Sequence, residues 1–446
     1  MRDDTIVALA SGAGLSGIAV LRVSGPQAGA TWRALAGREP ASPRHLARVR
    51  LVDPVSGEAL DDGLAVWFPG PHSYTGEDVT EFHVHGGRAV VAAVIAALQG
   101  LPACRLAEAG EFTRRAFEAG KMDLTAAEGL ADLIDSDTQA QRRQALRQLR
   151  GELGVLYEEW RARLVSAMAH LEATIDFSDE ELPPQLAAQV ATEVAAVSAA
   201  IAGHLADGRR GERLRGGVHV AILGPPNAGK SSLLNYLAGR DAAIVSESAG
   251  TTRDIIEVQL DLGGYPLVVA DTAGLRAGGD TIEREGVRRA QRRAGEVDLK
   301  VVLFDGAVWP ALDPQAAALL DEDCLAVLNK SDLGLAPDVI DIGGQQALAI
   351  SVKTGAGLDA FLTRLTSEVA ARCDVAAAPA ITRARHRQAL EDCRAALARF
   401  ENASGGGVEL AAEELRLAAR ALGRITGRVG VEDVLDVVFR DFCIGK

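Results

Sequence analysis

The stretch from Gly217 to Asn235, GVHVAILGPPNAGKSSLLN, decides the fold of the central part of the chain. It opens with the apolar, β-branched run 218–223, which is typical of a buried strand, and it ends in residues that start a helix. Between them, residues 224–231 match G-x-x-x-x-G-K-[ST] without a mismatch. Backbone N–H groups and a helix N-terminus must surround a bound phosphate, and this context supplies both. The stretch therefore predicts a phosphate-loop nucleotide-binding domain.

Four further segments follow in the order that a GTP-binding domain requires. Residues 250–254 bring threonines within reach of Mg²⁺ and the γ-phosphate, and a predicted strand ends in the D-x-x-G run 271–274. A second strand ends in the N-K-x-D run 329–332. The carboxylate of Asp332 can accept hydrogen bonds from N1–H and the 2-amino group of guanine, which adenine lacks. The run 351–353 can offer a backbone N–H to guanine O6.

Together these segments predict the residues that contact GTP. They are Asn227, Ala228, Gly229, Lys230, Ser231, Ser232, Ser246, Glu247, Ser248, Ala249, Gly250, Thr251, Thr252, Asp271, Thr272, Ala273, Gly274, Asn329, Lys330, Asp332, Ser351, Val352 and Lys353.

The side chains that accelerate hydrolysis are less obvious. Many GTPases use a glutamine after D-x-A-G to orient the attacking water, and here Leu275 stands in that position. An arginine finger is worth about 10³–10⁵ in rate, and Arg253 and Arg276 are candidates for one. Neither is identified as a finger by its surroundings in the sequence, so another positive charge is needed.

A monovalent cation could supply that charge. Asn227 lies inside the phosphate loop, and Ser246, Ser248 and Thr251 supply further oxygen ligands. We hypothesise that K⁺ binds there and that an acidic residue such as Glu283 positions the water. The predicted catalytic residues are therefore Glu283, Lys230 and Asn227.

Composition limits the other classes of function. The 446 residues suggest about two to four domains, and 48% hydrophobic with 24% charged residues is ordinary for a globular protein. A net charge of −14 argues against a wholly basic surface for nucleic acid, but not against a local basic patch. The longest apolar run, 89–98, is too short to cross a bilayer, and the five cysteines show no metal or disulfide spacing. We expect a cytoplasmic protein with no membrane partner.

The first 118 residues predict a mixed α/β domain. Strands are expected at 5–9, 18–23, 64–68 and 79–85 because these runs are β-branched or alternate apolar and polar residues. His83 and His85 fall on one face of the last strand. We interpret them as a polar strand face, since no third metal ligand follows at a suggestive spacing.

The next segment, from about Glu111 to Leu205, shows helical periodicity. Apolar residues recur every three or four positions through 153–175, and again through 186–205. The helix predicted before this segment carries four arginines: Arg142, Arg143, Arg147 and Arg150. A solvated face is the preferred interpretation of these arginines, and a contact with nucleic acid is the alternative.

The order of the segments suggests an insertion. Residues 209–217 are charged, contain several glycines and lack an apolar face, so they are predicted to be a linker. Helical periodicity returns after the nucleotide domain. We therefore expect an α/β domain in residues 1–118, a helical domain in 119–212 and 373–446, and a nucleotide domain in 213–372 inserted into it.

Short motifs along the whole chain resemble one family, the MnmE (TrmE) tRNA-modification GTPases. They are 21–25 (LRVSG), 69–71 (PGP), 75–78 (TGED), 85–87 (HGG), 110–113 (GEFT) and 442–446 (FCIGK), together with the phosphate loop. The resemblance implies a multidomain α/β plus all-α fold: an α/β folate-binding domain related to aminomethyltransferases, a helical bundle and an inserted Ras-like P-loop GTPase domain.

The resemblance also implies an activity and its partners. The family forms a homodimer through the N-terminal domain and a heterotetramer with the flavoprotein MnmG. Together they install a carboxymethylaminomethyl or aminomethyl group at C5 of the wobble uridine of certain tRNAs, with a one-carbon unit from 5-formyl- or methylene-tetrahydrofolate. GTP hydrolysis, with K⁺ and Mg²⁺, brings the two GTPase domains together and drives a conformational change.

Individual residues are implied by match to the family motifs. Folate would contact Arg22, Glu81, Lys121 and Lys446; K⁺ would bind Asn227, Ser246, Ser248 and Thr251; Mg²⁺ would bind Ser231 and Thr252; and Glu283 would orient water. Cys443, inside the terminal motif, could serve either packing or chemistry.

Two other functions fit part of the sequence. A ribosome-assembly GTPase would bind RNA and modify nothing, but such proteins often carry a second GTPase domain or a basic tail. A folate enzyme regulated by GTP would turn over folate without a flavoprotein. A test of folate binding would distinguish a ribosome-assembly GTPase from a tRNA-modification GTPase. Turnover of folate without the flavoprotein would favour the folate enzyme regulated by GTP.

Overall fold

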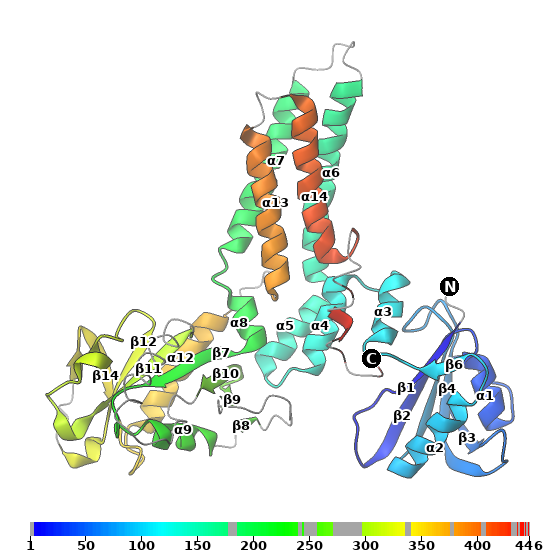
Figure 1. The fold of residues 1–446 in the computed structure, drawn as a ribbon, viewed down its shortest axis with the longest axis horizontal. Helices are drawn as coiled ribbons and strands as arrows, with labels where there is room; N and C mark the ends of the chain where they lie inside the picture. Colours follow the sequence, from blue (N-terminus) through cyan, green and yellow to red (C-terminus); the bar gives the residue numbers. More distant parts are fainter. Residues whose placement is uncertain are drawn as a thin grey trace, which may run out of the picture. The chain divides into compact units, whose positions relative to one another are not determined.

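The computed structural model describes residues 4–176, 185–239, 243–244, 257–270, 297–334, 340–374, 379–402, 407–429, 435, 438–440, 442 and 445. The chain divides into two compact units, each with its own sheet (Figure 1). The first consists of Met1–Ala131, Leu149–Arg161 and Leu422–Lys446, and the second of Asp132–Gln148 and Ala162–Ala421. The boundaries of the three predicted domains stay predictions. No helix in the described residues has the length and apolar content needed to cross a bilayer.

The first unit is built on a six-stranded sheet of order β3-β4-β5-β2-β1-β6. Its strands are β1 (Thr5–Leu9), β2 (Ser16–Ser24), β3 (Ala47–Val52), β4 (Ala59–Phe68), β5 (Val79–Gly86) and β6 (Cys104–Leu106). All neighbours are antiparallel except β1 and β6. The four strands expected from the sequence are confirmed.

One face of this sheet is covered by α1 (Ala28–Ala36) and α2 (Arg88–Gln99). Trp32 and Leu98 from these helices pack against Leu21 and Phe82 of the sheet, and all four are fully buried. On the other face, α3 (Glu111–Glu118) contributes Phe112, which packs on Ile6 of β1.

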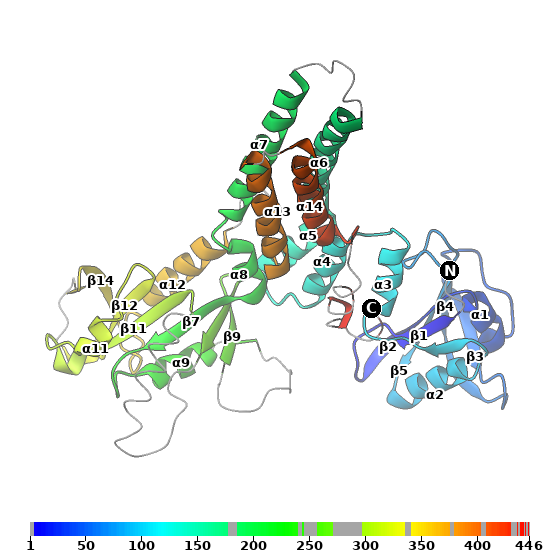
Figure 2. The same cartoon turned by 45° about the horizontal axis from the view of Figure 1, so that its top comes forward.

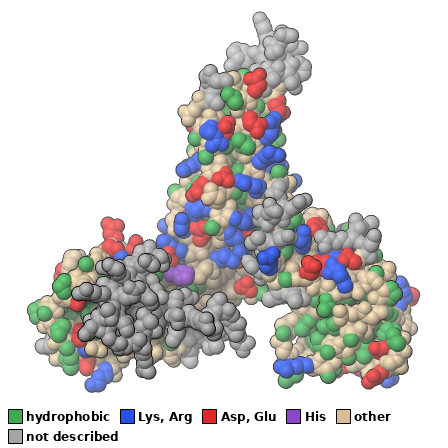
Figure 3. All heavy atoms as spheres, viewed as in Figure 1, with side chains coloured by type: hydrophobic (Ala, Val, Ile, Leu, Met, Phe, Trp, Pro, Cys, Tyr) green, Lys and Arg blue, Asp and Glu red, His purple; other side chains and the backbone are tan. Residues whose placement is uncertain are grey.

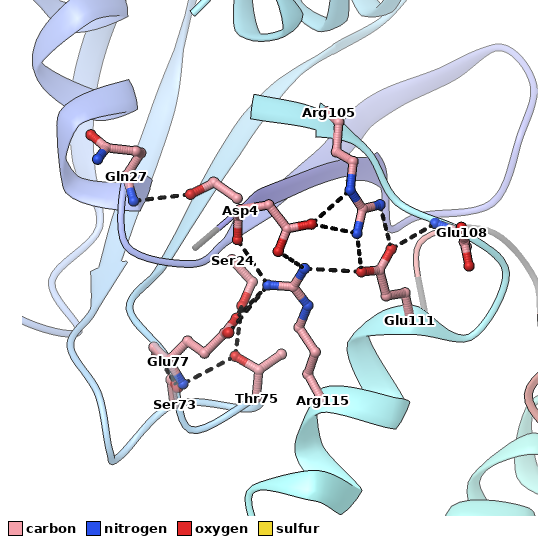
Figure 4. A network of polar contacts seen from close by, with 11 residues as sticks. Asp4, Ser24, Gln27, Ser73, Thr75, Glu77, Arg105, Glu108, Glu111 and Arg115 are labelled. Carbon is pink, nitrogen blue, oxygen red and sulfur yellow. Dashed lines mark hydrogen bonds and ion pairs between the residues drawn. The ribbon is translucent and has the colours of Figure 1, made fainter. Parts of the chain in front are cut away.

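A network of charged side chains joins α3 to the sheet (Figure 4). The guanidinium of Arg115, whose side chain is only 2% exposed, donates to Asp4 at 3.0 Å, to Glu111 at 2.9 Å and to both Glu77 oxygens at 3.1 Å. Arg105 donates to Asp4 at 2.7 Å and to Glu111 at 2.5 Å. Buried charges are tolerated when several partners satisfy them, as here. The 75–78 and 110–113 motifs therefore have a structural role in this unit.

The second unit is built on an eight-stranded sheet of order β13-β14-β12-β11-β7-β10-β9-β8. Its strands are β7 (Val218–Leu223), β8 (Ala243–Ile244), β9 (Glu257–Leu262), β10 (Tyr265–Ala270), β11 (Leu299–Asp305), β12 (Cys324–Asn329), β13 (Ile340–Ile342) and β14 (Gln345–Ala349). Strands β14, β12, β11, β7 and β10 are parallel.

Both faces of this sheet are buried, as a parallel sheet requires. On one face α9 (Lys230–Ala238) and α12 (Leu358–Cys373) pack against alternate residues of β7, for example Val220 and Ile222. On the other, α11 (Pro314–Ala317) packs near Leu223 and Phe304. Short 3₁₀ turns follow β11 at Gly306–Val308 and β12 at Ser331–Leu333. The predicted phosphate-loop α/β domain is confirmed.

The remaining helices form the all-α part of the fold (Figures 1 and 2). They are α4 (Leu124–Ile134), α5 (Gln139–Leu149), α6 (Glu152–Asp176), α7 (Gln185–Leu205), α8 (Arg210–Gly216), α13 (Ala384–Asn402) and α14 (Val408–Thr426). In both views α7 and α13 lie side by side. Most residues of the predicted stripes that the structure describes are buried, as at Leu164 on α6 and Val194 on α7, and the others are half-buried.

The predicted linker at 209–217 is wrong, because residues 210–216 form helix α8. Its Gly211 passes so close to the chain at Ile381 that an added Cβ would lie 2.4 Å from that carbonyl oxygen. Arg213 pairs with Asp298 at 2.6 Å, and Arg215 pairs with Asp132. Helix α8 has no long apolar stripe. These ion pairs and the buried Leu214 stabilise it instead.

The charged network in the first unit predicts a stability that depends on Glu111. Burial alone would raise the pKa of Glu111, but hydrogen bonds from Arg105, the Glu108 N–H and Arg115 lower it from 4.5 to about 2. Because the folded pKa is the lower one, the stabilisation is complete above about pH 4.5 and is lost as the pH falls toward 2.

We expect Glu111→Gln to lower the free energy of opening of strand β1 by about 1–3 kcal/mol at neutral pH, since it removes a buried carboxylate that accepts from both arginines and leaves them only Asp4 and Glu77 as charged partners. Hydrogen exchange measured by mass spectrometry reports that opening. The variant should also lose less stability than the wild type on acidification from pH 4.5. The matched control is Glu39→Gln, at a side chain that is 76% exposed. Equal protection of β1 in both variants would contradict the expectation.

Candidate functional sites

The phosphate loop lies at the carboxyl end of β7, where the sheet places it beside β11. Gly224 has φ +139°, and an added Cβ would lie 2.2 Å from the carbonyl oxygen of Leu303. Gly229 has φ +101°, and its Cβ would lie 2.1 Å from the side-chain nitrogen of Asn329. Both positions therefore require glycine, one for the close approach to β11 and one for the turn into α9.

The side chains of the loop present charge and oxygen ligands. Nζ of Lys230, the first residue of α9, donates to the carbonyl oxygens of Gly224 and Pro225, both at 2.8 Å. The ammonium group thus lies across the loop. Asn227 has a left-handed backbone with φ +62° and is exposed, as is Ser231 in the first turn of α9.

Asn329, the first residue of N-K-x-D, ties three segments together. It is 3% exposed at the end of β12. Its Nδ2 donates to the carbonyl oxygen of Ala228 at 2.8 Å, and its Oδ1 accepts from the Val352 N–H at 3.2 Å. One carboxamide therefore fixes the phosphate loop relative to the 351–353 segment. The sequence predicted that Asn329 belongs to the site but not this bridging position.

The other two residues of the motif are held in defined orientations. Nζ of Lys330 donates to Asp305, at the end of β11, at 2.6 Å. Burial would raise the pKa of Asp305, but Lys330 and the Ala307 N–H keep it below its usual value, so Asp305 is ionised near neutral pH. Asp332 is exposed, and its Oδ1 accepts from the Ser351 hydroxyl at 2.7 Å. The carboxylate is thus aimed by a fully buried serine.

Only one backbone N–H of the 351–353 run is without a partner in the part of the chain that is described. The Ser351 N–H donates to the Ala356 carbonyl oxygen at 2.8 Å, and the Val352 N–H donates to Asn329. The Lys353 N–H remains. Among the three predicted candidates, it is the group that can reach a base oxygen.

Several predicted site residues lie outside the described residues. They are Ser246, Glu247, Ser248, Ala249, Gly250, Thr251, Thr252, Asp271, Thr272, Ala273, Gly274, Glu283, Cys443 and Lys446. The structure brings together the remaining nucleotide residues, from Asn227 to Ser232, from Asn329 to Asp332 and from Ser351 to Lys353, at the carboxyl ends of β7, β12 and β14. This edge of a parallel sheet is where α/β folds bind ligands.

A second candidate site lies on the sheet of the first unit. Arg22 of β2 donates from Nε to Glu81 of β5 at 2.8 Å, and the two residues are register partners. The guanidinium carbon lies 5.1 Å from the ring centre of Tyr74 and 5.8 Å from that of Phe112. Burial would raise the pKa of Glu81, but His83 and Arg22 lower it, so it is a carboxylate near neutral pH.

Lys121 and the end of the chain adjoin other parts of the same unit. Cε of Lys121 lies 3.5 Å from the position that a Cβ on Gly76 would occupy. Gly445 approaches the end of β1 so closely that an added Cβ would lie 2.0 Å from the carbonyl oxygen of Leu9. Arg22 and Glu81 are therefore in direct contact, while Lys121 lies beside the 75–78 motif.

The histidines of β5 have carboxylate neighbours. Nδ1 of His85 lies 2.7 Å from Asp61, and Nε2 of His83 lies 3.6 Å from Glu81. No cluster of three or more metal-ligating side chains occurs among the described residues.

Sequence reasoning missed Asp305, Tyr74 and Phe112. Asp305 could have been found, because it ends an apolar strand next to the one that carries N-K-x-D. Tyr74 precedes the 75–78 motif and Phe112 lies inside the 110–113 motif, but nothing in the sequence indicates that both rings approach Arg22.

Comparisons with known proteins cover the whole chain. The family model described as the MnmE helical domain matches residues 124–443, and the model described as the GTP-binding protein TrmE N-terminus matches residues 5–121. The tRNA modification GTPase MnmE of Parvibaculum lavamentivorans is 58% identical over 99% of this chain and 100% of its own length. That of Paramagnetospirillum magneticum is 56% identical over the full length of both. The human mitochondrial 5-taurinomethyluridine-[tRNA] synthase subunit GTPB3 is 49% identical over 99% of this chain and 93% of its own.

The orientation of Asp332 predicts the base that the nucleotide site accepts. In Asp332→Asn, an amide N–H replaces one acceptor, so it should repel the guanine N1–H and 2-amino edge and suit the C2 carbonyl of xanthine. We expect GTP affinity to fall by about 10³-fold or more and xanthosine triphosphate to bind more tightly than GTP. Fluorescent-nucleotide titration measures both.

Asp359→Asn, at an exposed residue of α12, is the matched control and should leave GTP affinity unchanged. Retention of wild-type GTP affinity in Asp332→Asn would show that this carboxylate does not recognise the base.

Proposed function

The chain belongs to the MnmE family of tRNA modification GTPases, and on this premise we propose how it works. It hydrolyses GTP in the second unit with K⁺ and Mg²⁺. With a flavoprotein partner, the MnmG subunit, it installs the aminomethyl or carboxymethylaminomethyl group at C5 of the wobble uridine of certain tRNAs. A folate one-carbon unit held in the first unit supplies the carbon. The observation that carries the GTP part is the Asn329 bridge, with Asp332 oriented beside it.

The roles of the nucleotide residues follow from their contacts. Lys230 would exchange its loop carbonyls for the β- and γ-phosphate oxygens, since phosphate is the stronger acceptor for an ammonium group. Asp332 would accept from guanine, and the Lys353 N–H would donate to its O6. Because Asn329 joins the loop to the base-reading segment, binding of the base and of the phosphates should depend on the same buried side chain.

The oxygen atoms that the loop offers as metal ligands suit hard cations. The exposed carboxamide of Asn227 and the exposed hydroxyl of Ser231 are neutral oxygen ligands of the kind that K⁺ and Mg²⁺ prefer. Asn227 with Ser246, Ser248 and Thr251 would hold K⁺, and Ser231 with Thr252 would hold Mg²⁺. The two ions would supply positive charge to the phosphates as the leaving group gains charge. Asp271 to Gly274 would adjoin the γ-phosphate, and Glu283 would position the attacking water.

The Arg22–Glu81 pair suits a folate. A pterin ring presents amino and N–H donors, and the Glu81 carboxylate, which stays ionised, can accept them. Tyr74 and Phe112 supply aromatic surface next to the ion pair. Arg22, Lys121 and Lys446 are cations for the glutamate tail. Supporting this assignment, two of the four residues implied by the family motifs are in direct contact.

The homodimer is supported by exposed apolar residues on a sheet face that α3 covers only in part. Opposite the α1 and α2 side, Leu64 is 37% exposed next to His83 and Val20 on neighbouring strands, and Ile18 at the start of β2 is 62% exposed. A second copy of the chain would cover these apolar groups. The MnmG subunit would join the dimer in a heterotetramer, in the cytoplasm.

The whole proposal is tested in cells that lack this protein, by mass spectrometry of tRNA nucleosides. Wild-type chain should restore the C5-substituted uridine, and Arg22→Ala should not, because the folate site loses its cation. Arg33→Ala, at an exposed arginine of α1, is the control and should restore it. Full restoration by Arg22→Ala would contradict the folate assignment, and no restoration by the wild type would contradict the tRNA-modification function.

A further inference from the structure

Helices α5 and α8 of the second unit lie side by side. Nε2 of Gln141 donates to the carbonyl oxygen of Arg215 at 3.0 Å, and Nε2 of Gln144 donates to that of Gly211 at 3.1 Å. Because the partner number falls as the helix α5 number rises, the two helices are antiparallel. The Ala140 N–H also donates to Gly264, in the turn between β9 and β10, at 3.1 Å. The two glutamine side chains hold the helices together, and the Ala140 bond joins α5 to the nucleotide-binding sheet.

The two helices concentrate positive charge in an acidic protein. The chain has 61 acidic and 47 basic residues. Helix α5 contains three arginines and no acidic residue, and residues 209–216 contain four arginines and one glutamate, Glu212. In Figure 3, blue Lys and Arg side chains gather near the lower end of the helices, where α8 and α5 lie. A basic patch of this kind is what an acidic protein needs in order to hold a polyanion.

Some of these arginines are committed to structural ion pairs and others are not. Arg213 pairs with Asp298, and Arg215 pairs with Asp132. Arg209 has a side chain that is 70% exposed, and its carboxylate neighbour, Glu212, is 3.9 Å away. Arg210 is exposed, and among the described residues it donates only to a backbone carbonyl oxygen, at 3.4 Å.

On α5, Arg142 and Arg143 are both exposed. Within the described residues, neither of them has a carboxylate at ion-pair distance. Among the described residues, three exposed arginines on the two helices thus have no carboxylate at ion-pair distance, and a fourth, Arg209, has only the 3.9 Å contact with Glu212. The four are Arg142, Arg143, Arg209 and Arg210, and we call them the α5–α8 patch.

We propose that the α5–α8 patch binds the phosphate backbone of the tRNA. This rests on the proposed function, which requires that tRNA be held by an acidic protein. Guanidinium groups match phosphate oxygens with paired N–H donors, and neutralised phosphates release counterions, which supplies affinity without reading sequence. The proposal takes up the alternative interpretation of Arg142 and Arg143, a contact with nucleic acid.

The position of the patch connects tRNA to the nucleotide site. Asp298 accepts from Arg213 of α8 at 2.6 Å and, through its other oxygen, from the His219 N–H of β7 at 3.0 Å. Helix α8 ends at Gly216, and β7, which leads into the phosphate loop, begins at Val218. A tRNA on the patch would therefore rest on the segment that enters the GTP site.

The test compares tRNA binding by full-length wild type and three double variants, measured by fluorescence anisotropy over about 50–200 mM salt. Two remove charge from the patch: Arg142→Gln with Arg143→Gln, and Arg209→Gln with Arg210→Gln. The control, Arg394→Gln with Arg420→Gln, changes two exposed arginines of α13 and α14. Basal GTP hydrolysis without tRNA should be unchanged in all three, which verifies the fold.

Each patch variant should bind tRNA at least about tenfold more weakly at 0.1 M salt. Its plot of log affinity against log salt should be shallower by about 1–2, because up to two phosphate contacts are lost. The control should match the wild type. Wild-type affinity and slope in both patch variants would overturn the patch alone, leaving the proposed function standing.

Failure of the wild type to bind tRNA would overturn the patch and the tRNA part of the proposed function together. Loss of binding to the flavoprotein subunit with unchanged tRNA binding would also overturn the proposal. That result would assign the patch to an acidic protein surface instead.

Discussion

The buried carboxamide of Asn329 is the constraint on which the nucleotide site depends. It donates to the phosphate loop at Ala228 and accepts from the base-reading segment at Val352, so it joins the ends of β7, β12 and β14. A side chain 3% exposed to water loses much if either bond is broken, because an unsatisfied buried polar group costs about 1–3 kcal/mol. Recognition of the base and recognition of the phosphates therefore depend on the same side chain.

In the first unit, ion pairs and not an amide side chain hold separate segments together. Arg115 and Arg105 hold Asp4, Glu77 and Glu111 from three separate segments, and this arrangement fixes α3 against the sheet. Glu77 and Glu111, from two of the short motifs, thus stabilise the framework of this unit. In the second unit, ion pairs of α8 with Asp132 and Asp298 fix the entry to β7 in the same way.

Much of the fold could be predicted because its signals are local. Apolar alternation marked β1 and β5, and G-x-x-x-x-G-K-S with N-K-x-D marked the nucleotide site. Helix α8 could not be predicted, since its stabilising partners lie 83 and 85 residues away in the sequence. The same holds for Arg115, whose partner Asp4 is 111 residues away. Long-range charge pairing leaves no periodic pattern, so it is visible only in the folded chain.

The central claim is that GTP hydrolysis at this loop depends on a monovalent cation held by its asparagine. The direct measurement is the steady-state GTP hydrolysis rate of the full-length chain in K⁺ and in Na⁺ at equal ionic strength, for wild type and for Asn227→Ala. The account predicts a rate at least about tenfold higher in K⁺ for the wild type, given that one positive charge at the phosphates is worth about 10³-fold or more, and no cation preference for the variant. Equal rates in the two salts for the wild type would contradict it.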